Sequence, residues 1–296
     1  MLNPQWLLSF ETLHELGSFT RAAERLGLTQ AAVSQHVRQL EARLGPLLVR
    51  RPRLEATPAG KALLDYCREL QQADRRLRQR LEDGQSLDGE FGLICPGSVG
   101  LFLYPLLLDL QREHPGLVVR QRFAPDDEVR QAVLAQQYEL GLLTLRPDDA
   151  RLVSRPFLKE ALELVVPRDA KVEGWDDLAR LGFIDHPDGR AMAARLLRRR
   201  FPEHPGLDSL PVRGFSNQIG LLLEPVARGL GFTVLPHYAR RAFNSQDTVR
   251  VLDGGPEVVD TLWLMHRAEW PLSGRARRVL DLLEPRVADA LATLRG

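Results

Sequence analysis

The spacing of apolar residues changes twice along the chain, and each change predicts a different kind of structure. Up to residue 60, apolar residues recur every three or four positions in short segments separated by glycines, which is the pattern of short amphipathic helices. A longer helix is predicted from about residue 58 to 83. Beyond residue 90, short apolar runs alternate with helical segments, as in strands joined by helices. The expected division is therefore 1–60, 61–89 and 90–296.

The first region predicts three short helices. Pro4 suits the first turn of a helix that ends at Gly17, Ser18 can cap a second helix, and Thr29 can cap a third. The third helix ends at Gly45 and has one apolar face, made of Val33, Val37, Leu40 and Leu44. The tight turn at residues 27–29 makes the second and third helices a predicted helix-turn-helix.

Polar residues on the opposite side of the third helix are candidates for reading DNA. Gln can bond adenine and Arg can bond guanine through two hydrogen bonds each, Ser is permissive, and an Ala methyl can contact thymine. An ordinary solvated helix face would carry the same residue types. The basic hairpin, or wing, that follows favours DNA, because arginines there suit phosphates or the minor groove. The candidates are Gln30, Ala31, Ser34, Gln35 and Arg38 on the helix and Arg50, Arg51 and Arg53 in the wing.

Thr57 and Pro58 open the long helix as a cap and a first-turn proline. Its stripe of apolar residues is Leu63, Leu70, Leu77 and Leu81, with Cys67 and Ala73 between them. Packing on its own domain and pairing with the same helix of a second subunit both remain open, and the near-heptad spacing favours pairing. Residues 84–89 are predicted to form a polar hinge.

The third region predicts two α/β lobes, because alternating strands and helices imply a parallel sheet covered on both faces. Lobe I is expected at about 90–166 and 267–296, and lobe II at about 167–266. Predicted elements include helices at 100–112 and 216–228 and a strand at 162–166.

In open α/β lobes, ligands bind beyond the carboxyl ends of strands, where helix N-termini present free N–H groups. Two such junctions, at 96–100 and 215–218, would favour a carboxylate or other small anion. Asp185 would suit an ammonium group on the same ligand, as in an amino acid. Capping of helices alone is the other interpretation. The candidate effector-binding residues are Ser98, Val99, Gly100, Thr144, Asp185, Ser216 and Asn217.

Charge and composition narrow the protein class. The 40 Lys and Arg residues balance 39 Asp and Glu, and only 3 of the 40 are lysines, which disfavours a uniformly basic packaging protein. Residues 1–60 carry 7 cations against 5 anions, so placement of arginines matters more than net charge. Two cysteines, Cys67 and Cys95, exclude a disulfide scaffold and a four-cysteine zinc site. A single bridge between them stays open, and two buried apolar residues are favoured. No secretory signal or 18-residue apolar run is found, so a cytoplasmic protein without membrane contact is expected.

An enzyme is disfavoured. A hydrolase elbow requires a glycine two residues before its serine and another two residues after it. Gly100 fits the second place after Ser98, but Pro96 occupies the first. The histidines have no paired metal-ligand spacing, and Gly229 to Gly231 follows a helix instead of opening one, the reverse of a dinucleotide loop. We expect no catalytic residue, no metal and no cofactor apart from a small-molecule effector. A sensor that does not bind DNA is the remaining alternative.

Two motifs resemble those of LysR-type transcriptional regulators. The first runs from Phe10 to Gly60 and includes 17–23, 29–35 and Thr57-Pro58-Ala59-Gly60. The second is Val226-Ala227-Arg228-Gly229-Leu230-Gly231 followed by Leu235-Pro236. The resemblance implies a winged helix-turn-helix, a dimerising linker helix and a two-lobed effector domain like that of periplasmic binding proteins. It adds Thr20 to the DNA-binding candidates.

The same resemblance implies the partners. They are double-stranded promoter DNA, further copies of the chain in a homodimer or homotetramer, a small-molecule effector and, as a further candidate, RNA polymerase. A wing one residue short between Arg50 and Thr57, with Asp185-His186-Pro187-Asp188, is similar to the branch that controls basic amino acid export. We do not assign the effector from that similarity.

Overall fold

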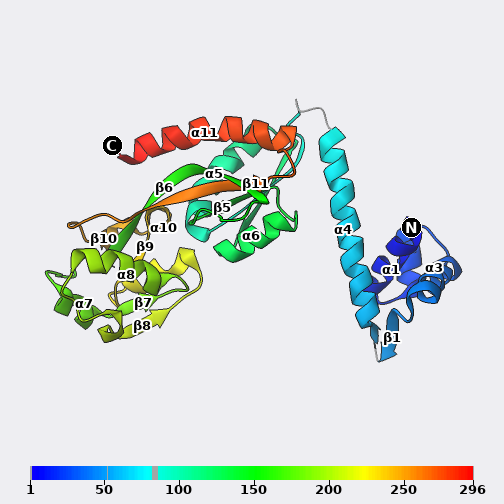
Figure 1. The fold of residues 1–296 in the computed structure, drawn as a ribbon. Coiled ribbons are helices and arrows are strands. Elements are labelled where there is room, and N and C mark those ends of the chain that lie inside the picture. Colours follow the sequence, from blue (N-terminus) through cyan, green and yellow to red (C-terminus); the bar gives the residue numbers. More distant parts are fainter. Residues whose placement is uncertain (1, 52, 82–85, 296) are drawn as a thin grey trace. The chain divides into compact units, whose positions relative to one another are not determined.

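The computed structural model describes residues 2–51, 53–81 and 86–295, and the chain divides into two compact units, Met1–Glu82 and Asp83–Gly296 (Figure 1). The first unit is helical with one small hairpin. Its elements are α1 (Pro4–Leu16), α2 (Phe19–Leu26), α3 (Gln30–Leu44), β1 (Leu48–Arg51), β2 (Arg53–Ala56) and α4 (Pro58–Leu81).

The predicted starts of these helices and the predicted ends of the first three are confirmed, because local groups set them. The predicted end of the long helix at about residue 83 and the first part of the predicted hinge at 84–89 lie outside the described residues. Gly17 ends α1 in the left-handed conformation, at φ 63°. The Ser18 side chain caps α2, and the Thr29 hydroxyl accepts a hydrogen bond of 3.1 Å from the Ala32 amide at the start of α3. Leu44, predicted to complete the apolar face of α3, is 41% exposed. It lies in the last turn of the helix, beyond the buried residues of that face.

The predicted wing is also confirmed as a hairpin of β1 and β2. The carboxylate of Glu41 on α3 accepts hydrogen bonds from the Leu47 and Leu48 amides, which ties the first strand to the helix. After the hairpin, the Thr57 hydroxyl donates to the Pro46 carbonyl at 2.7 Å and accepts from the Gly60 amide at 3.0 Å. Thr57 therefore caps α4 and fixes where it begins.

The stripe on α4 divides into two parts. Leu63 and Cys67 are buried in the core of the first unit, whereas Leu70 and Leu77 are 40% and 54% exposed. The side chain of Leu81 lies outside the described residues. The N-terminal half of α4 thus packs on its own unit, and its C-terminal half presents leucines to solvent.

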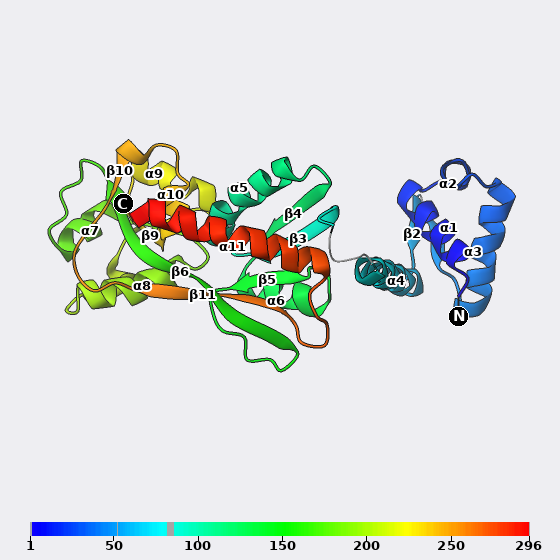
Figure 2. The same ribbon diagram turned by 90° about the horizontal axis from the view of Figure 1, so that it is seen from above.

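The second unit contains strands and helices in two lobes joined by long strands (Figure 2). Its elements are β3 (Gly89–Cys95), α5 (Gly97–Glu113), β4 (Leu117–Phe123), α6 (Asp126–Leu134), β5 (Leu140–Leu143), β6 (Leu152–Pro167), α7 (Trp175–Leu181), β7 (Phe183–Asp185), α8 (Gly189–Arg200), β8 (Val212–Phe215), α9 (Leu223–Ala227), β9 (Thr233–Pro236), α10 (His237–Arg241), β10 (Val249–Val251), β11 (Val259–Arg267) and α11 (Gly274–Arg295). Single 3₁₀ turns lie at Leu207–Ser209, Ile219–Leu221 and Gln246–Thr248.

The main sheet is mixed, which corrects the prediction of a parallel sheet. Strand β3 pairs in parallel with β4 and β5, but β11 runs antiparallel to β5 and β6, and β9 and β10 run antiparallel to β6. The pattern of residues did not indicate this because the first ten residues of β6 contain Pro156, Lys159 and Glu160 among the apolar positions. Only the apolar end of this strand was predicted.

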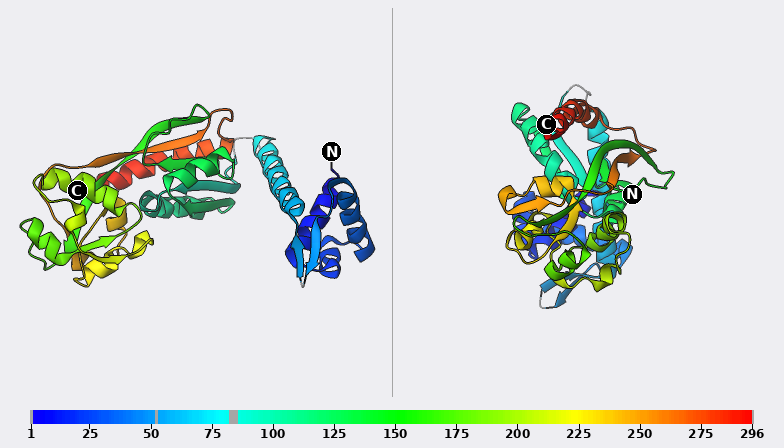
Figure 3. Two further views of the ribbon diagram at one scale, coloured as in Figure 1. Left: turned by 60° about the horizontal axis from the view of Figure 1, so that its bottom comes forward. Right: turned by 90° about the vertical axis from the view of Figure 1, so that its left-hand side faces the viewer.

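Strands β6 and β11 belong to both lobes and lie side by side (Figures 2 and 3). Leu158 and Leu262 enter the core of lobe I, with β3, β5, α5 and α11. Leu162 and Val166 enter the core of lobe II, with α7 and α8. The two strands therefore form the connection between the lobes.

Two helix predictions near the expected ligand site need correction. Helix α5 begins at Gly97, three residues before the predicted start. The predicted helix at 216–228 is a 3₁₀ turn at Ile219–Leu221 followed by the short α9. Gly220 and Pro225 interrupt that segment, and both residues disfavour a continuous helix.

Candidate functional site

The polar face of α3 is open to solvent in the first unit. Gln30, Ala31, Gln35 and Arg38 are exposed, and Ser34 is half-buried. The Arg38 guanidinium donates to the Ser34 hydroxyl at 3.1 Å, so these two side chains support each other one turn apart. Thr20 is exposed in the first turn of α2. The predicted base-reading residues on α3 thus share one accessible face.

His36 supports this face and was missed by sequence reasoning. Its Nδ1 lies 2.8 Å from the hydroxyl of Ser9, which is buried on α1. The bond joins the inner side of α3 to α1 and helps to fix the rotation of α3. A histidine beside an apolar stripe carries no signal that would distinguish this role.

The wing places three arginine positions at its tip. In the register of the hairpin, Arg51 is opposite Arg53, and Arg50 is opposite Leu54. The side chains of these arginines lie outside the described residues, so their contact with phosphates stays a prediction.

The first turn of α5 is buried. Val99 is fully buried in the core of lobe I, and a Cβ added to Gly100 would lie 2.2 Å from the ring of Phe123. Ser98 is 6% exposed, and its hydroxyl donates to the carboxylate of Glu160. Val99 and Gly100 therefore pack the lobe, and Ser98 already has a partner of its own chain.

Thr144 lies beside another internal carboxylate. Its amide and hydroxyl donate to Asp126, at 2.9 and 2.8 Å from Oδ2, and the Leu145 amide donates to the same atom at 3.2 Å. Burial raises the pKa of Asp126 in spite of these bonds, and the negative charge of Asp188 in lobe II raises it further.

The three candidates in lobe II are neighbours. The Ser216 amide donates to the Asp185 carbonyl at 3.1 Å, and Asp185 forms an ion pair of 3.4 Å with Arg190. Asn217 is exposed and Ser216 half-buried. These residues follow the carboxyl ends of β7 and β8, as expected, but Ser216 begins a turn and no helix N-terminus.

The lobes touch where the candidate residues of lobe I and lobe II approach each other. A Cβ added to Gly97 would lie 2.9 Å from Cγ2 of Ile219. Only one of the two predicted helix N-termini is present, the one at α5. The hydroxyl of Ser98 at this N-terminus donates its hydrogen bond to Glu160.

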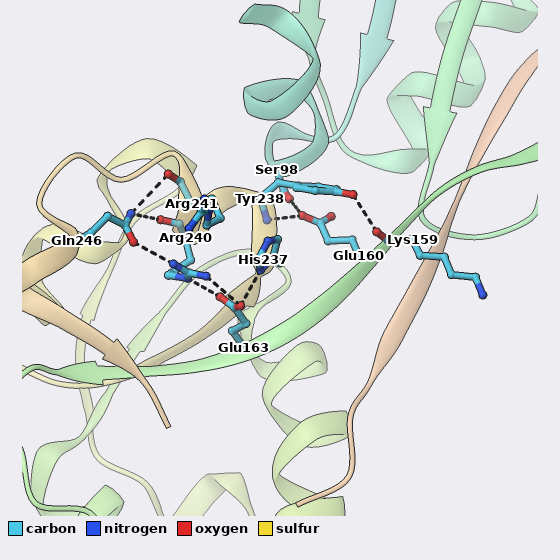
Figure 4. A network of polar contacts seen from close by, with 9 residues as sticks. All are labelled: Ser98, Lys159, Glu160, Glu163, His237, Tyr238, Arg240, Arg241 and Gln246. Carbon is cyan, nitrogen blue, oxygen red and sulfur yellow. Dashed lines mark hydrogen bonds and ion pairs between the residues drawn. The ribbon is translucent and has the colours of Figure 1, made fainter. Parts of the chain in front are cut away.

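Glu160 and Glu163 on β6 are the main polar residues that sequence reasoning missed at this junction (Figure 4). Glu163 binds His237 at 2.7 Å and Arg240 at 2.7 Å. Burial alone would raise the pKa of Glu163, but these hydrogen bonds and charges outweigh it and hold the pKa below its usual range. The partners are more than 70 residues away in the sequence, so no local pattern could indicate them.

The pKa of Glu160 shifts in the opposite direction to that of Glu163, although Glu160 lies only three residues earlier on the same strand. It is 5% exposed and accepts hydrogen bonds from the Ser98 hydroxyl and the Tyr238 amide. Burial raises its pKa to about 7, although both hydrogen bonds oppose the change. A buried carboxyl group with this pKa changes its charge near neutral pH.

Among the described residues, no group of three or more His, Cys, Asp or Glu is placed to hold a metal ion. Within the same part of the chain, no helix is both long and apolar enough to span a membrane. Cys67 and Cys95 are buried, as expected. Burial is the main reason that their pKa values rise to about 11 and about 12, which leaves both thiols protonated at neutral pH.

Comparison with known proteins covers both units. A family model described as a bacterial regulatory helix-turn-helix protein of the lysR family matches residues 4–61, and a LysR substrate binding domain matches residues 84–288. The nitrogen assimilation regulatory protein Nac of Klebsiella aerogenes is 30% identical over 95% of this chain and 94% of its own. The transcriptional regulator IlvR of Caulobacter vibrioides is 30% identical over 92% of this chain and 94% of its own.

Solved structures show the same fold. Full-length CbnR in complex with its target DNA matches with a TM-score of 0.69 and 21% identity, over 94% of this chain and 98% of that one. HinK, a LysR family transcriptional regulator of Pseudomonas aeruginosa, matches with a TM-score of 0.54 and 20% identity, over 97% and 98%.

Proposed function

The chain belongs to the LysR family of transcriptional regulators, and from this premise we propose how it reads DNA and senses a small molecule. The exposed polar face of α3 enters the major groove of promoter DNA. The wing contacts the adjacent backbone or minor groove. The second unit binds an effector between its lobes and changes how the oligomer sits on the promoter.

The observation that carries the DNA-binding proposal is the arrangement of α3. Gln30, Gln35 and Arg38 are exposed on one face, while Val33 and Val37 anchor the opposite face in the core. Gln and Arg are the side chains that pair bidentately with adenine and guanine. The solved complex of CbnR with its target DNA supports a role for this fold at DNA.

A mobility-shift assay tests this proposal, with DNA that contains a dyad and comes from upstream of the gene that encodes this chain. Gln35→Ala is expected to weaken binding to that site by about 1 to 3 kcal/mol and to leave binding to random DNA nearly unchanged. Gln5→Ala, an exposed glutamine at the start of α1, is the matched control and should bind as the parent chain does. Equal losses of Gln35→Ala on specific and random DNA would show that Gln35 reads no base.

Salt dependence gives a second measurement. If the Arg38 guanidinium contacts a phosphate, Arg38→Ala should make the fall of log affinity with log salt concentration less steep. If it contacts guanine, the variant should discriminate less between bases. Binding that is absent, or insensitive to salt, would contradict regulation through DNA and favour the sensor without DNA binding.

The effector site lies at the junction of the lobes in this proposal. Exposed and half-exposed groups there are Thr144 of lobe I and Asp185, Ser216 and Asn217 of lobe II. Large apolar side chains at the carboxyl ends of β4 and β8 are also exposed, Phe123 by 48% and Phe215 by 65%. We therefore expect a small molecule with both an apolar part and polar groups, such as an amino acid or other small carboxylate.

A thermal-shift screen of the twenty amino acids and of simple carboxylates would test the effector proposal. A compound that stabilises the full chain should lose much of its effect with Asn217→Ala but keep it with Asn244→Ala. Asn244 is an exposed asparagine elsewhere in lobe II. An undiminished response of Asn217→Ala would remove that residue from the site.

A further inference from the structure

Glu160 on β6 lies where this strand meets α5 and α10 of the second unit. Its Oε1 accepts hydrogen bonds from the Ser98 hydroxyl in the first turn of α5 and, at 2.9 Å, from the Tyr238 amide in the first turn of α10. The rings of Phe102 on α5 and Tyr238 stack with centroids 4.4 Å apart. The Tyr238 hydroxyl donates to the Lys159 carbonyl at 2.9 Å. One carboxyl group on β6 thus joins α5 of lobe I to α10, which follows β9 of lobe II (Figure 4).

The described residues give Glu160 no ion-pair partner. Lys159 is exposed, and its side chain extends away from Glu160 (Figure 4). The other charged or titratable groups around it are Glu163, which binds His237 and Arg240, Asp260 on β11, which binds Arg195 of α8, and the buried thiol of Cys95 at the end of β3. Asp260 and Glu163 add negative potential at Glu160, and the nearby cations are bound to these two carboxylates.

We propose that Glu160 is a proton-operated interlobe tie: the protonated side chain holds the first turn of α5 against that of α10, and the ionised side chain loosens this contact. The interlobe tie is the set Glu160, Ser98 and Tyr238. When the proton is on Oε2, Oε1 still accepts both hydrogen bonds and no charge is buried. When the group is ionised, a carboxylate without a cation is held out of water, which favours any opening that hydrates it.

The direction of the pH effect follows from linkage. The tied state binds a proton more strongly than an open state in which Glu160 is hydrated, because burial raises its pKa to about 7 from a usual value of 4.5. Lower pH therefore favours the tied state. Between pH 8 and pH 6, full hydration on opening would make the ratio of tied to open molecules rise about tenfold.

The tie would also affect effector binding, because Glu160 and the effector would compete for the Ser98 hydroxyl. This part of the inference rests on the proposed function. Ser98 is a candidate effector contact, but its hydroxyl is held by Glu160. An effector carboxylate that reaches Ser98 must take this donor from Glu160. Such an effector would act on the contact between the lobes directly.

Hydrogen exchange of the full chain, free of DNA and of added small molecules, tests the tie. After correction for intrinsic exchange rates, protection of a peptide that contains Tyr238 and of one that contains 97–101 should fall up to about tenfold from pH 6 to pH 8. Glu160→Gln keeps an oxygen acceptor but has no proton to lose, so its protection should not show this fall. His237 is retained in both proteins, so any pH dependence that it causes is common to both.

Two further comparisons keep the test specific. Ser98→Ala should lower protection of the Tyr238 peptide at pH 6. Ser209→Ala removes a hydroxyl that bonds only within lobe II, to Gly206, and should not lower it. Exchange of β4 amides, inside lobe I, reports the general stability of the lobe. The same pH dependence in the parent chain and in Glu160→Gln, or no dependence in either, would overturn the proposal.

This outcome is independent of DNA binding, which the mobility shift measures. A chain that shows the pH response but binds no DNA would keep the tie and lose the proposed function. If the parent chain binds its DNA site but shows the same hydrogen exchange as Glu160→Gln at both pH values, the tie is wrong and the proposed function stands.

Discussion

A single residue, Gly60, shows how closely the first unit is packed. Gly60 is buried in the first turn of α4, and a Cβ added there would lie 2.2 Å from the Leu47 carbonyl oxygen and 3.3 Å from the Cβ of Ala56. Because Leu47 also accepts a backbone hydrogen bond from Thr57, its carbonyl cannot move away without breaking the base of the wing.

Gly60→Ala should therefore destabilise the first unit by about 2 to 3 kcal/mol, since overpacking outweighs the better helix propensity of alanine. Calorimetry of the full chain should show the transition of this unit at a Tm lower by about 10 °C. The neighbouring exposed Ala59 supplies the control, and Ala59→Ser should change the Tm little. An unshifted transition in Gly60→Ala would mean that α4 can move from the wing at no cost.

At the same scale, sequence reasoning succeeded where a residue acts on its near neighbours. Ser18, Thr29 and Thr57 cap helices within three residues of themselves, so their roles follow from local rules. Glu160 could not be found in this way, because its hydrogen-bond partners are 62 and 78 residues away. Ser98 was identified from its position, but not its partner.

At the scale of the elements, only part of the apolar stripe on α4 is buried in the core of the first unit. Its near-heptad stripe continues past the core of the first unit, where Leu70 and Leu77 remain 40% and 54% exposed. These leucines are seven residues apart and so lie close to one face of the helix. We interpret this face as the surface that pairs with another copy of the chain.

Replacement of these leucines should weaken the oligomer. Leu70→Glu with Leu77→Glu should shift the full chain toward smaller species in analytical ultracentrifugation, because charged groups would be buried in the helix pair. Leu108→Glu, at a leucine of α5 in the second unit that is 42% exposed, is the control and should sediment like the parent chain. Unchanged assembly of the double variant would place the contact elsewhere.

At the scale of the whole molecule, stability should depend on pH through Glu160. Its pKa is raised in the folded chain to about 7 from 4.5, so the native state binds more protons than the unfolded state between these values. The free energy of unfolding therefore falls as pH rises from about 4.5 to about 7, by about 3 kcal/mol for this group, and does not fall further above that range.

Urea unfolding followed by tryptophan fluorescence would measure this effect, because Trp175, Trp263 and Trp270 are in the second unit and only Trp6 is in the first. Glu160→Gln should remove the fall, so the difference between the two proteins should grow across the window. A constant difference from pH 4.5 to pH 7 would show that Glu160 does not titrate there.

The sequence by itself determined the helix-turn-helix, the wing and the long helix after it, because caps, glycines and helical periodicity act over a few residues. Its two motifs indicated the family by resemblance. It also located the apolar end of β6 and both segments that meet between the lobes. Only the tertiary structure decided that β6 and β11 run antiparallel through both lobes, and that the first helix of lobe I donates its serine hydroxyl to a carboxylate of the same chain. The reason is that strand direction and buried polar pairing depend on contacts between distant segments, whose energies no local pattern records.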